Sequence, residues 1–331
     1  MVVTRGPARA GLPPAFALPS ALTIGNFDGV HLGHQAMLAR VREMARESGL
    51  ASGVLTFEPH PREFFSPSSA PTRLTTLREK LELLSAQGID RTHVQRFTRE
   101  FASQSPEAFV ESILVDSLSV RRLLIGDDFR FGAKRAGDLA LLEKLAARHG
   151  FDVEVMRTVE RGGARVSSSV VREALMLGDL VRAQALLGRA YSMSGRVVHG
   201  DKLGRELGFA TANVQMRHNR PPLAGIFAVR MHGAGDACEV RDGVASLGVR
   251  PTVKSTGHPV LEVHLLDFSG NIYGRHVRVE FLHKLRDEEK YPDLETLRVQ
   301  IARDCEAARA FLRGLKVPGE IRPVKSVVQG S

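Results

Sequence analysis

Hydrophobic residues in the first part of the chain alternate between short continuous runs and helical spacing. The continuous runs have the length of buried strands and occupy residues 22–24, 53–57, 120–125 and 151–156. After the first run, apolar residues recur every three or four positions, which predicts a helix from about Leu32 to Gly49. Further helices are predicted over 77–88, from Ser105 and from Ser167. This alternation of strands and helices predicts a parallel α/β domain.

The pattern changes near Gly188, where helical spacing gives way to short alternating strands with glycine-rich turns. Strands that follow one another this closely are typical of an antiparallel barrel. Five are predicted, over 191–198, 224–231, 240–247, 260–268 and 277–282. A helix whose apolar side includes Leu294 and Leu312 closes the barrel. The expected domains are an α/β domain over 1–188, an all-β barrel over 189–315 and a short flexible tail over 316–331.

The composition fits a globular protein of two domains, with 331 residues, of which 43% are hydrophobic and 25% charged. No apolar run approaches the roughly 20 residues that span a bilayer. Residues 1–19 are broken by prolines and Gly11, and lack the apolar core of a secretion signal. The two cysteines, Cys238 and Cys305, imply no disulfide framework. We expect a cytoplasmic protein without a membrane partner.

The formal net charge of +9 raises the question of a nucleic-acid partner. The lysines and arginines are dispersed along the chain, which has no Trp and three Tyr, so no basic run is interleaved with aromatic residues that would stack bases. A diffuse positive charge suits small polyanions such as nucleotides equally well. We therefore expect small phosphorylated substrates and no nucleic acid.

The stretch from Leu22 to His34 joins an apolar run to the start of a helix through two glycines, Gly25 and Gly29. Such a junction presents backbone N–H groups and a helix dipole to a phosphate. His31 and His34, three residues apart, would add donors on the same side. The alternative is an ordinary turn with incidental surface histidines. A metal site is less favoured, because no third ligand follows at zinc-like spacing.

Three later segments of the α/β half carry candidate chemistry. Two prolines flank His60 after a predicted strand. This pattern fits either a rigid loop at the carboxyl edge of the sheet, where open α/β sheets bind ligands, or an ordinary turn. The loop from Gly126 to Gly132 contains Asp127 and Asp128, and fits either a nucleotide or metal ligand or a simple acidic turn. Hydroxyls from Ser167 onward are typical of a helix cap.

In the barrel half, the most informative stretch runs from His199 to Asn213. Its glycines at 200, 204 and 208 permit close approach of the backbone to an anion, which Lys202 and Arg205 would neutralise. Thr211 and Asn213 alternate on one strand face and offer two neutral oxygens suited to hydrated Mg²⁺. The alternative is a glycine-rich barrel corner. The spacing is not that of a Walker A motif.

Period-two alternation around Glu262 places Leu261, Val263 and Leu265 on one strand face. Glu262 and His264 occupy the other face. The carboxylate is then either a solvated outward group or a general base that faces a polar cavity and takes a proton from a substrate hydroxyl.

The motif Gly25-x-Phe27-Asp28-Gly29-x-His31-x-Gly33-His34 resembles the signature of the nucleotidyltransferase superfamily, and its Phe-Asp-Gly-Val-His form is similar to the bacterial bifunctional riboflavin kinase/FAD synthetase family. Segments around Asp128 and Arg172 resemble that family too, although Ser169 replaces a Thr and Val170 a polar residue. The resemblance implies catalytic roles for His31 and His34. It also implies a Rossmann-like domain whose ATP is bound by Gly25, Phe27, Asp28, Gly29, Asp128, Ser168 and Arg172.

The barrel half resembles the riboflavin kinase signature of the same family, Gly-Arg-x-Leu-Gly-Phe-Pro-Thr-Ala-Asn, with Ala210 in place of the proline. Ser246 and Leu247 replace an expected Asn and Ile. The resemblance implies that Glu262 is the general base and that Mg²⁺ binds to Thr211 and Asn213. It implies an ATP site at Gly200, Lys202, Gly204 and Arg205, and a flavin site at Arg250, Pro251 and Thr252.

Together these resemblances, from about Ala21 to Leu312, imply an α/β plus all-β protein that makes FAD in two steps. The barrel would phosphorylate riboflavin to FMN with ATP, and the first domain would transfer an adenylyl group from ATP to FMN, releasing pyrophosphate. Three alternatives are considered: a single retained activity, a nucleotidyltransferase for another phosphorylated substrate, and a non-enzymatic flavin or nucleic-acid binding module.

Overall fold

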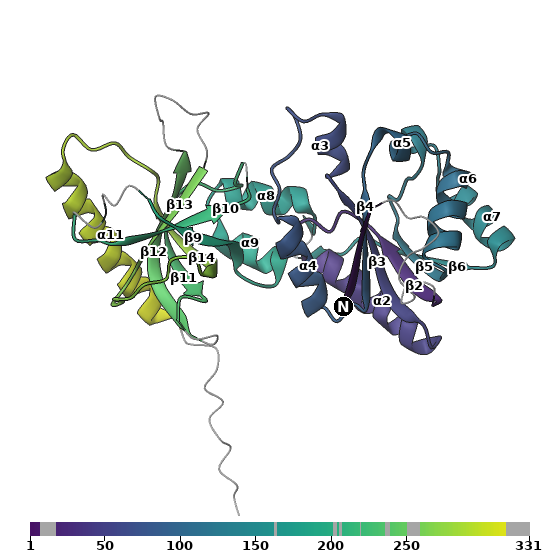
Figure 1. Cartoon of the computed structure of the whole chain (residues 1–331), viewed down its shortest axis with the longest axis horizontal. Coiled ribbons are helices and arrows are strands. Elements are labelled where there is room, and N and C mark those ends of the chain that lie inside the picture. Colours follow the sequence, from purple (N-terminus) through teal and green to yellow (C-terminus); the bar gives the residue numbers. More distant parts are fainter. Residues whose placement is uncertain are drawn as a thin grey trace, which may run out of the picture.

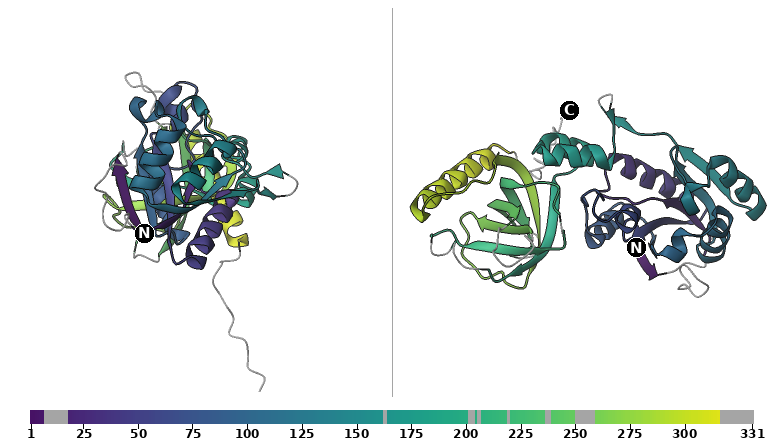
Figure 2. Two further views of the ribbon diagram at one scale, coloured as in Figure 1. Left: turned by 90° about the vertical axis from the view of Figure 1, so that its right-hand side faces the viewer. Right: turned by 90° about the horizontal axis from the view of Figure 1, so that it is seen from above.

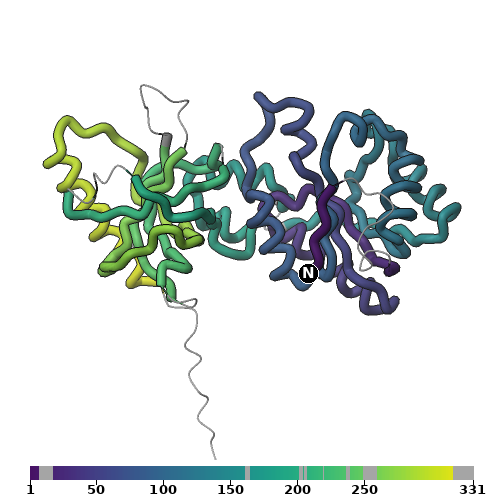
Figure 3. The backbone as a smooth tube through the Cα atoms, in the orientation of Figure 1, coloured from purple at the N-terminus to yellow at the C-terminus, as the bar shows by residue number. Residues whose placement is uncertain are grey.

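The computed structural model describes residues 1–6, 18–161, 164–200, 204, 207–218, 220–235, 239–249 and 259–315. They form two lobes, a parallel sheet covered by helices and a closed antiparallel barrel flanked by α11 (Leu294–Gly314) (Figure 1). The tube in Figure 3 shows the teal part of the chain passing from the first lobe to the second. The predicted fold class is confirmed.

The sheet of the first lobe contains six strands in the order β1-β4-β3-β2-β5-β6, and every pairing is parallel. The central β2 has β3 on one side and β5 on the other, so the strand order reverses beside β2. Ligands bind at such a switch point, beyond the carboxyl ends of the strands. The strands are β1 (Val2–Gly6), β2 (Ser20–Ile24), β3 (Ala51–Glu58), β4 (Arg91–Arg96), β5 (Val120–Gly126) and β6 (Asp152–Met156).

Helices cover both faces of this sheet (Figure 1). In α2 the buried residues are Leu38, Val41, Met44 and Ala45, which are periodic positions that predicted the helix. The Ser105 and Ser167 hydroxyls accept N-terminal backbone N–H groups, so both predicted caps are confirmed. The helices are α2 (Leu32–Glu47), α3 (Pro61–Phe65), α4 (Leu77–Ala86), α5 (Arg99–Ala102), α6 (Pro106–Phe109), the π-helical η1 (Val110–Ser117), the 3-10 turn η2 (Ala133–Arg135), α7 (Leu139–His149), α8 (Ser168–Met176) and α9 (Leu180–Leu187).

The barrel closes in the order β10-β13-β12-β11-β14-β9, with antiparallel pairing throughout. Its interior is apolar, and α11 packs on the outside through Cys305, Ala308 and Leu312. Seen from above, α11 lies across the barrel wall (Figure 2). The strands are β9 (Tyr191–Val198), β10 (Thr211–Met216), β11 (Gly225–His232), β12 (Val240–Val249), β13 (Pro259–Leu265) and β14 (His276–Arg286), and a small hairpin, β7 (Glu160–Arg161) with β8 (Ala164–Arg165), precedes α8.

Several side chains join the two lobes. Helix α9 ends at Gly188, whose φ of 72° is the left-handed conformation of a helix C-cap. Arg189 then donates to the carbonyls of Gly29 and Val30 at 2.7 and 3.1 Å. The Tyr191 hydroxyl donates to the Leu74 carbonyl at 3.0 Å. The first barrel strand is thereby held against the loops at the carboxyl edge of the sheet.

The domain boundary at residue 188 remains a prediction. Apolar side chains of α8 and α9, such as Leu175 and Leu187, belong to the same buried cluster as the barrel interior. The predicted tail over 316–331 lies outside the described residues. Within the described segments, every helix is too short or too polar to cross a bilayer.

Two strands of the sheet, β1 and β4, were not predicted. β4 reads Arg-Thr-His-Val-Gln-Arg, yet its first five residues are buried. The His93 ring lies 2.8 Å from the Thr4 hydroxyl on β1, so polar side chains satisfy one another inside the sheet. A hydrophobic pattern does not reveal a strand of this kind.

Candidate functional site

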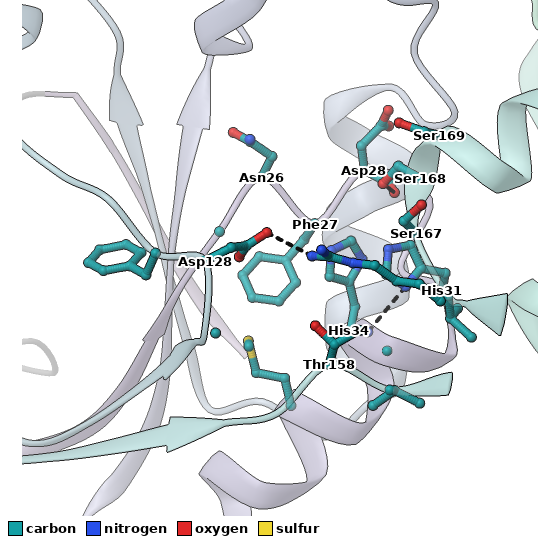
Figure 4. Close-up of a pocket in the computed structure, with 18 of the residues that line it drawn as sticks. Asn26, Phe27, Asp28, His31, His34, Asp128, Thr158, Ser167, Ser168 and Ser169 are labelled. Atoms are coloured by element: carbon teal, nitrogen blue, oxygen red, sulfur yellow. Dashed lines mark hydrogen bonds and ion pairs between the residues drawn. The ribbon is translucent and has the colours of Figure 1, made fainter. Parts of the chain in front are cut away.

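A cavity of about 390 Å³ lies at the carboxyl edge of the parallel sheet (Figure 4). The loops after β2, β3, β5 and β6 line it, together with the start of α8. It therefore occupies the switch point where β2 separates β3 from β5. The His60 loop also reaches this cavity, which confirms the prediction that it lies at the ligand edge of the sheet.

The turn after β2 holds residues in left-handed backbone conformations. Phe27 has φ of 48°, Gly29 of 82° and the β-branched Val30 of 39°, which is strained for a residue of that shape. The Val30 carbonyl accepts hydrogen bonds from Gln35 and Arg189, at 2.9 and 3.1 Å. These contacts hold the strained turn in the geometry that begins α2 beside the cavity.

The Asp28 carboxylate is buried in the wall of the cavity, where it is the hub of a hydrogen-bond network. It accepts the backbone N–H groups of Leu74 and Thr75 at 3.0 Å and the Thr75 hydroxyl at 3.1 Å. Arg172 of α8 forms an ion pair with the same carboxylate at 2.5 Å and donates to the Thr72 carbonyl. The Ser168 hydroxyl donates to the Asp28 carbonyl at 3.0 Å. Asp28 thus fixes α8 and the 72–75 segment around the site.

His31 lines the cavity and caps α2. Its Nδ1 accepts the backbone N–H of His34 at 3.3 Å, so a neutral ring carries its proton on Nε2. Burial lowers the pKa of His31 to about 4; Asp28 opposes the shift, and Arg172 adds to it. At neutral pH the ring is therefore uncharged and offers one N–H donor at the positive end of a 16-residue helix.

His34 supports His31 through stacking. The two ring centroids are 3.7 Å apart and the planes lie within 17° of each other, while the Phe27 ring packs on His34 at 5.0 Å. Burial, followed by the nearby His31 and Lys80, lowers the pKa of His34 well below the usual range. Its Nδ1 is buried without a hydrogen-bond partner among the described residues.

The far wall of the cavity is built from the loops after β5 and β6. Asp127 accepts from the backbone and hydroxyl of Thr158 at 3.2 and 3.1 Å, which joins the two loops. Asp128 forms an ion pair with Arg165 of β8 at 2.7 Å, with both side chains more than half exposed. Both residues line the cavity.

The structure gathers most of the residues expected to bind the nucleotide. Gly25, Phe27, Asp28, His31, His34, Asp128, Ser168 and Arg172 all line the cavity. Gly29 does not, because its backbone N–H is turned to the Thr75 hydroxyl at 3.1 Å. Sequence reasoning missed Arg62, Thr158 and Arg165 as lining residues. They come from separate loops and carry no shared spacing that would have identified them.

A second cavity, of about 520 Å³, lies between the outer face of the barrel and α11. Thr211, Asn213, Glu262 and His264 line it. Asn213 of β10 is directly opposite Glu262 of β13, and Thr211 is directly opposite His264. Leu261, Val263 and Leu265 point into the barrel, which confirms the predicted alternation.

Two glycines pack closely on the side chains expected to bind metal. A Cβ at Gly200 would lie 2.5 Å from the Asn213 Oδ1, and one at Gly204 would lie 3.1 Å from the Thr211 Oγ1. Only glycine leaves room for these oxygens in their present positions. Two neutral oxygens beside a carboxylate form a donor set that a hard cation such as Mg²⁺ prefers, so the residues present fit the expected metal.

The remaining wall of the barrel cavity was not foreseen. Arg286 of β14 pairs with the buried Asp304 of α11 at 2.7 Å, which fixes the helix against the barrel. Glu288 accepts from the Ser246 hydroxyl at 3.1 Å, and Ser246 is directly opposite Glu262. Arg286 and Glu288 both line the cavity.

Five predicted residues of the barrel half, Lys202, Arg205, Arg250, Pro251 and Thr252, lie outside the described residues. The Ala210 carbonyl, at the position where the resembling motif has proline, lies 2.9 Å from the His264 Nδ1. Because this contact uses the backbone carbonyl, a proline at position 210 would make it as well as Ala210 does.

Comparison with known proteins matches the two lobes separately. A family model described as FAD synthetase matches residues 14–170, and one described as riboflavin kinase matches residues 187–312. Relatives include the bifunctional riboflavin kinase/FMN adenylyltransferases of Haemophilus influenzae and Escherichia coli K12. The first is 48% identical, covering 88% of this chain and 94% of that protein; the second is 47% identical, covering 90% and 94%.

One solved structure resembles the whole chain. A protein described as a macrolide-efflux protein from Streptococcus pneumoniae superposes with a TM-score of 0.79, covering 93% of this chain and 99% of that one. At 24% sequence identity, this likeness shows a shared fold.

Proposed function

This chain belongs to the bifunctional riboflavin kinase/FMN adenylyltransferase family, and from that premise we propose how its two cavities divide the synthesis of FAD. The barrel cavity phosphorylates riboflavin with ATP, and the cavity of the parallel sheet transfers an adenylyl group from ATP to the resulting FMN. One observation carries the proposal: each lobe has its own cavity, and the catalytic residues expected for each reaction, His31 and His34 in one lobe and Glu262 in the other, line the cavity of that lobe.

In the barrel, Glu262 takes the proton from the 5′-hydroxyl of riboflavin as the oxygen attacks the γ-phosphate of ATP. The new bond forms at phosphorus, the bond to the β–γ bridging oxygen breaks, and ADP leaves. Asn213 is directly opposite Glu262, and Thr211 lies two residues before Asn213, so the side chains proposed to hold the cation stand beside this base. Positioning and charge stabilisation dominate phosphoryl transfer, and polar groups held in a pre-built cavity supply both.

Mg²⁺ is the divalent cation that this proposal assigns to the barrel cavity. Thr211 and Asn213 would hold it through their side-chain oxygens. When bound, it neutralises charge on the phosphates. The fit rests on the two glycines that leave space for these oxygens.

In the other lobe, a phosphate oxygen of FMN attacks the α-phosphate of a second ATP, and the bond to the pyrophosphate group breaks. The neutral His31 donates its Nε2–H to the α-phosphate, where negative charge builds up in the transition state. The N-terminus of α2 adds its dipole to the same position. His34 keeps the His31 ring in place by stacking against it.

The proposal is tested by incubating the protein with riboflavin, ATP and Mg²⁺ and separating the flavins by chromatography. FMN should appear first and FAD later, and FMN supplied with ATP should give FAD directly. Chelation of divalent cations should stop FMN formation from riboflavin, and added Mg²⁺ should restore it. Formation of only one of the two products would assign the chain a single activity. Both reactions consume ATP, and the proposal places them in the cytoplasm.

A further inference from the structure

A third cavity, larger than the other two at about 960 Å³, lies between the two lobes. The proposed reactions leave it without a role. One wall is the outer face of the barrel at β9, β10 and the start of β14. The other wall is the segment 71–78, which ends in the first turn of α4.

The barrel wall of this cleft carries uncompensated positive charge. Gln215 and His276 are the cross-strand neighbours of Arg196 on either side, so the three side chains stand in one row facing outward. Arg217 follows directly after β10 and lines the same space. Among the described residues, no carboxylate forms an ion pair with Arg196 or Arg217.

Arg220 extends this charged wall. It lines the cleft and donates to the Ala70 carbonyl at 2.8 Å, which is a neutral partner and leaves its charge unbalanced. His218, in the same wall, is hydrogen-bonded through Nε2 to Glu79 at 3.0 Å. Its Nδ1 is buried and has no partner among the described residues.

The acidic residues that line the cleft do not cancel this charge. Glu58 and Glu63 are both paired with Arg73, whose guanidinium donates to each carboxylate. Burial raises the pKa of Glu63, but the hydrogen bond from Arg73 outweighs it and keeps the carboxylate ionised. Arg73 balances only one of these two negative charges, but the three arginines of the barrel wall outweigh the one that remains, and their net positive charge in a concave space attracts anions.

The cleft lies next to both proposed active sites. Pro71 lines the cleft and the cavity of the parallel sheet alike. On the barrel side, Thr211, Asn213 and Gln215 project from the same face of β10; the first two line the barrel cavity and the third lines the cleft. Successive residues on one strand face are about 6.6 Å apart, so the cleft begins close to the barrel cavity.

We propose that the interlobe cleft is a third binding site, which takes the phosphate of FMN on Arg196, Arg217 and Arg220. This inference rests on the proposed function, because FMN is then made beside one end of the cleft and consumed beside the other. The phosphate monoester is a dianion that matches these arginines, and Met216, Pro67 and Pro71 offer apolar surface to the flavin ring. A site of this kind keeps FMN near the cavity that consumes it.

The test measures hydrogen–deuterium exchange of residues 191–198 and 276–280 in the full chain, with FMN or with riboflavin, which lacks the phosphate. FMN should slow exchange in both segments and riboflavin should not. Charge reversal in an Arg196→Glu/Arg217→Glu double variant should raise the FMN concentration needed for this protection by about tenfold or more. An Arg46→Glu/Arg148→Glu variant makes the same change in net charge at exposed positions outside the cleft and should keep the wild-type response.

Both enzymatic steps are assayed separately in each variant at saturating substrate. Absence of the two enzymatic activities from the wild-type protein would contradict the proposed function. Two results would overturn the cleft site alone, provided that both activities are intact. One is that FMN does not protect these segments from exchange, and the other is that FMN protects them equally in the charge-reversed variant. Protection by ATP or pyrophosphate but not by FMN would overturn the assignment of the ligand.

Discussion

Asn213 and Glu262 are direct partners across β10 and β13, so an amide oxygen and a carboxylate stand side by side on the outer face of the barrel. They are 49 residues apart in the chain, and antiparallel pairing alone brings them together. Thr211 lies on the same face, two residues before Asn213 on its strand. The predictions for the barrel depend on this arrangement.

Gly200→Ala should impair phosphorylation of riboflavin without affecting conversion of FMN to FAD. The added Cβ would lie 2.2 Å from the Asn213 amide nitrogen, so the side chain must move away from its place opposite Glu262. We expect a loss of kinase kcat of roughly 10²-fold, because small displacements of positioning groups cost that much. The matched control is Gly314→Ala, whose Cβ meets nothing within 4 Å. Unchanged kinase rates in Gly200→Ala would contradict the role of Asn213.

Asp28→Asn should destabilise the protein strongly. The substitution leaves Arg172, whose side chain is 12% exposed, without its charged partner, and breaking a buried pair costs about 3–5 kcal/mol. Urea denaturation at neutral pH measures the free energy of unfolding. Asp267→Asn removes an exposed partner of Arg309 and should cost less than about 1 kcal/mol. Equal losses in both variants would show that the Asp28 hub does not hold the site together.

The adenylyl transfer step should show no inflection from His31 between about pH 5.5 and 8. Burial holds the pKa of His31 at about 4, so the ring stays neutral throughout this range. The profile of kcat with FMN and ATP against pH measures it. His31→Gln keeps an N–H donor and should retain more activity than His31→Ala. An inflection near pH 6.5 that disappears in His31→Gln would mean that a protonated imidazole acts instead.

Stability should fall in acid through Glu79, which joins α4 to the barrel. Burial raises the pKa of Glu79, but hydrogen bonds from His218, Thr76 and Ser194 outweigh it and lower the pKa to about 2. The contribution of Glu79 is present above pH 4.5 and is lost as the pH falls toward 2. Glu79→Gln should flatten the dependence of the free energy of unfolding on pH in that window. Glu82→Gln, an exposed neighbour, should leave the wild-type slope.

The sequence predicted the elements whose hydrophobic pattern is regular. The periodic residues of α2 and the alternation around Glu262 each identified both the element and its buried face. Strand β4 was not predicted, because its buried residues include Thr92, His93 and Gln95, which form hydrogen bonds with polar neighbours. The periodicity of hydrophobic residues does not reveal a strand of this kind.

Site residues that lie close together in the chain could be predicted from the sequence. Residues that only tertiary contacts bring together could not. His31 and His34 lie in one turn of helix, and their shared location follows from their spacing. The Asp28–Arg172 pair spans 144 residues, and the Arg286–Asp304 pair depends on where α11 docks. Spacing in the chain carries no information on either pair. The family resemblance accordingly implied Arg172 as an ATP ligand and gave no sign of its pairing with Asp28.

The division of labour between the two cavities is tested most directly by one matched pair of variants, Glu262→Gln and His31→Ala, assayed with riboflavin and with FMN. Glu262→Gln should lose about 10²–10⁴-fold in FMN formation and still convert supplied FMN to FAD at the wild-type rate. His31→Ala should accumulate FMN and lose about 10²–10³-fold in FAD formation. A mixture of the two should restore FAD synthesis from riboflavin. Loss of both steps in either variant, with the fold intact, would contradict two independent sites.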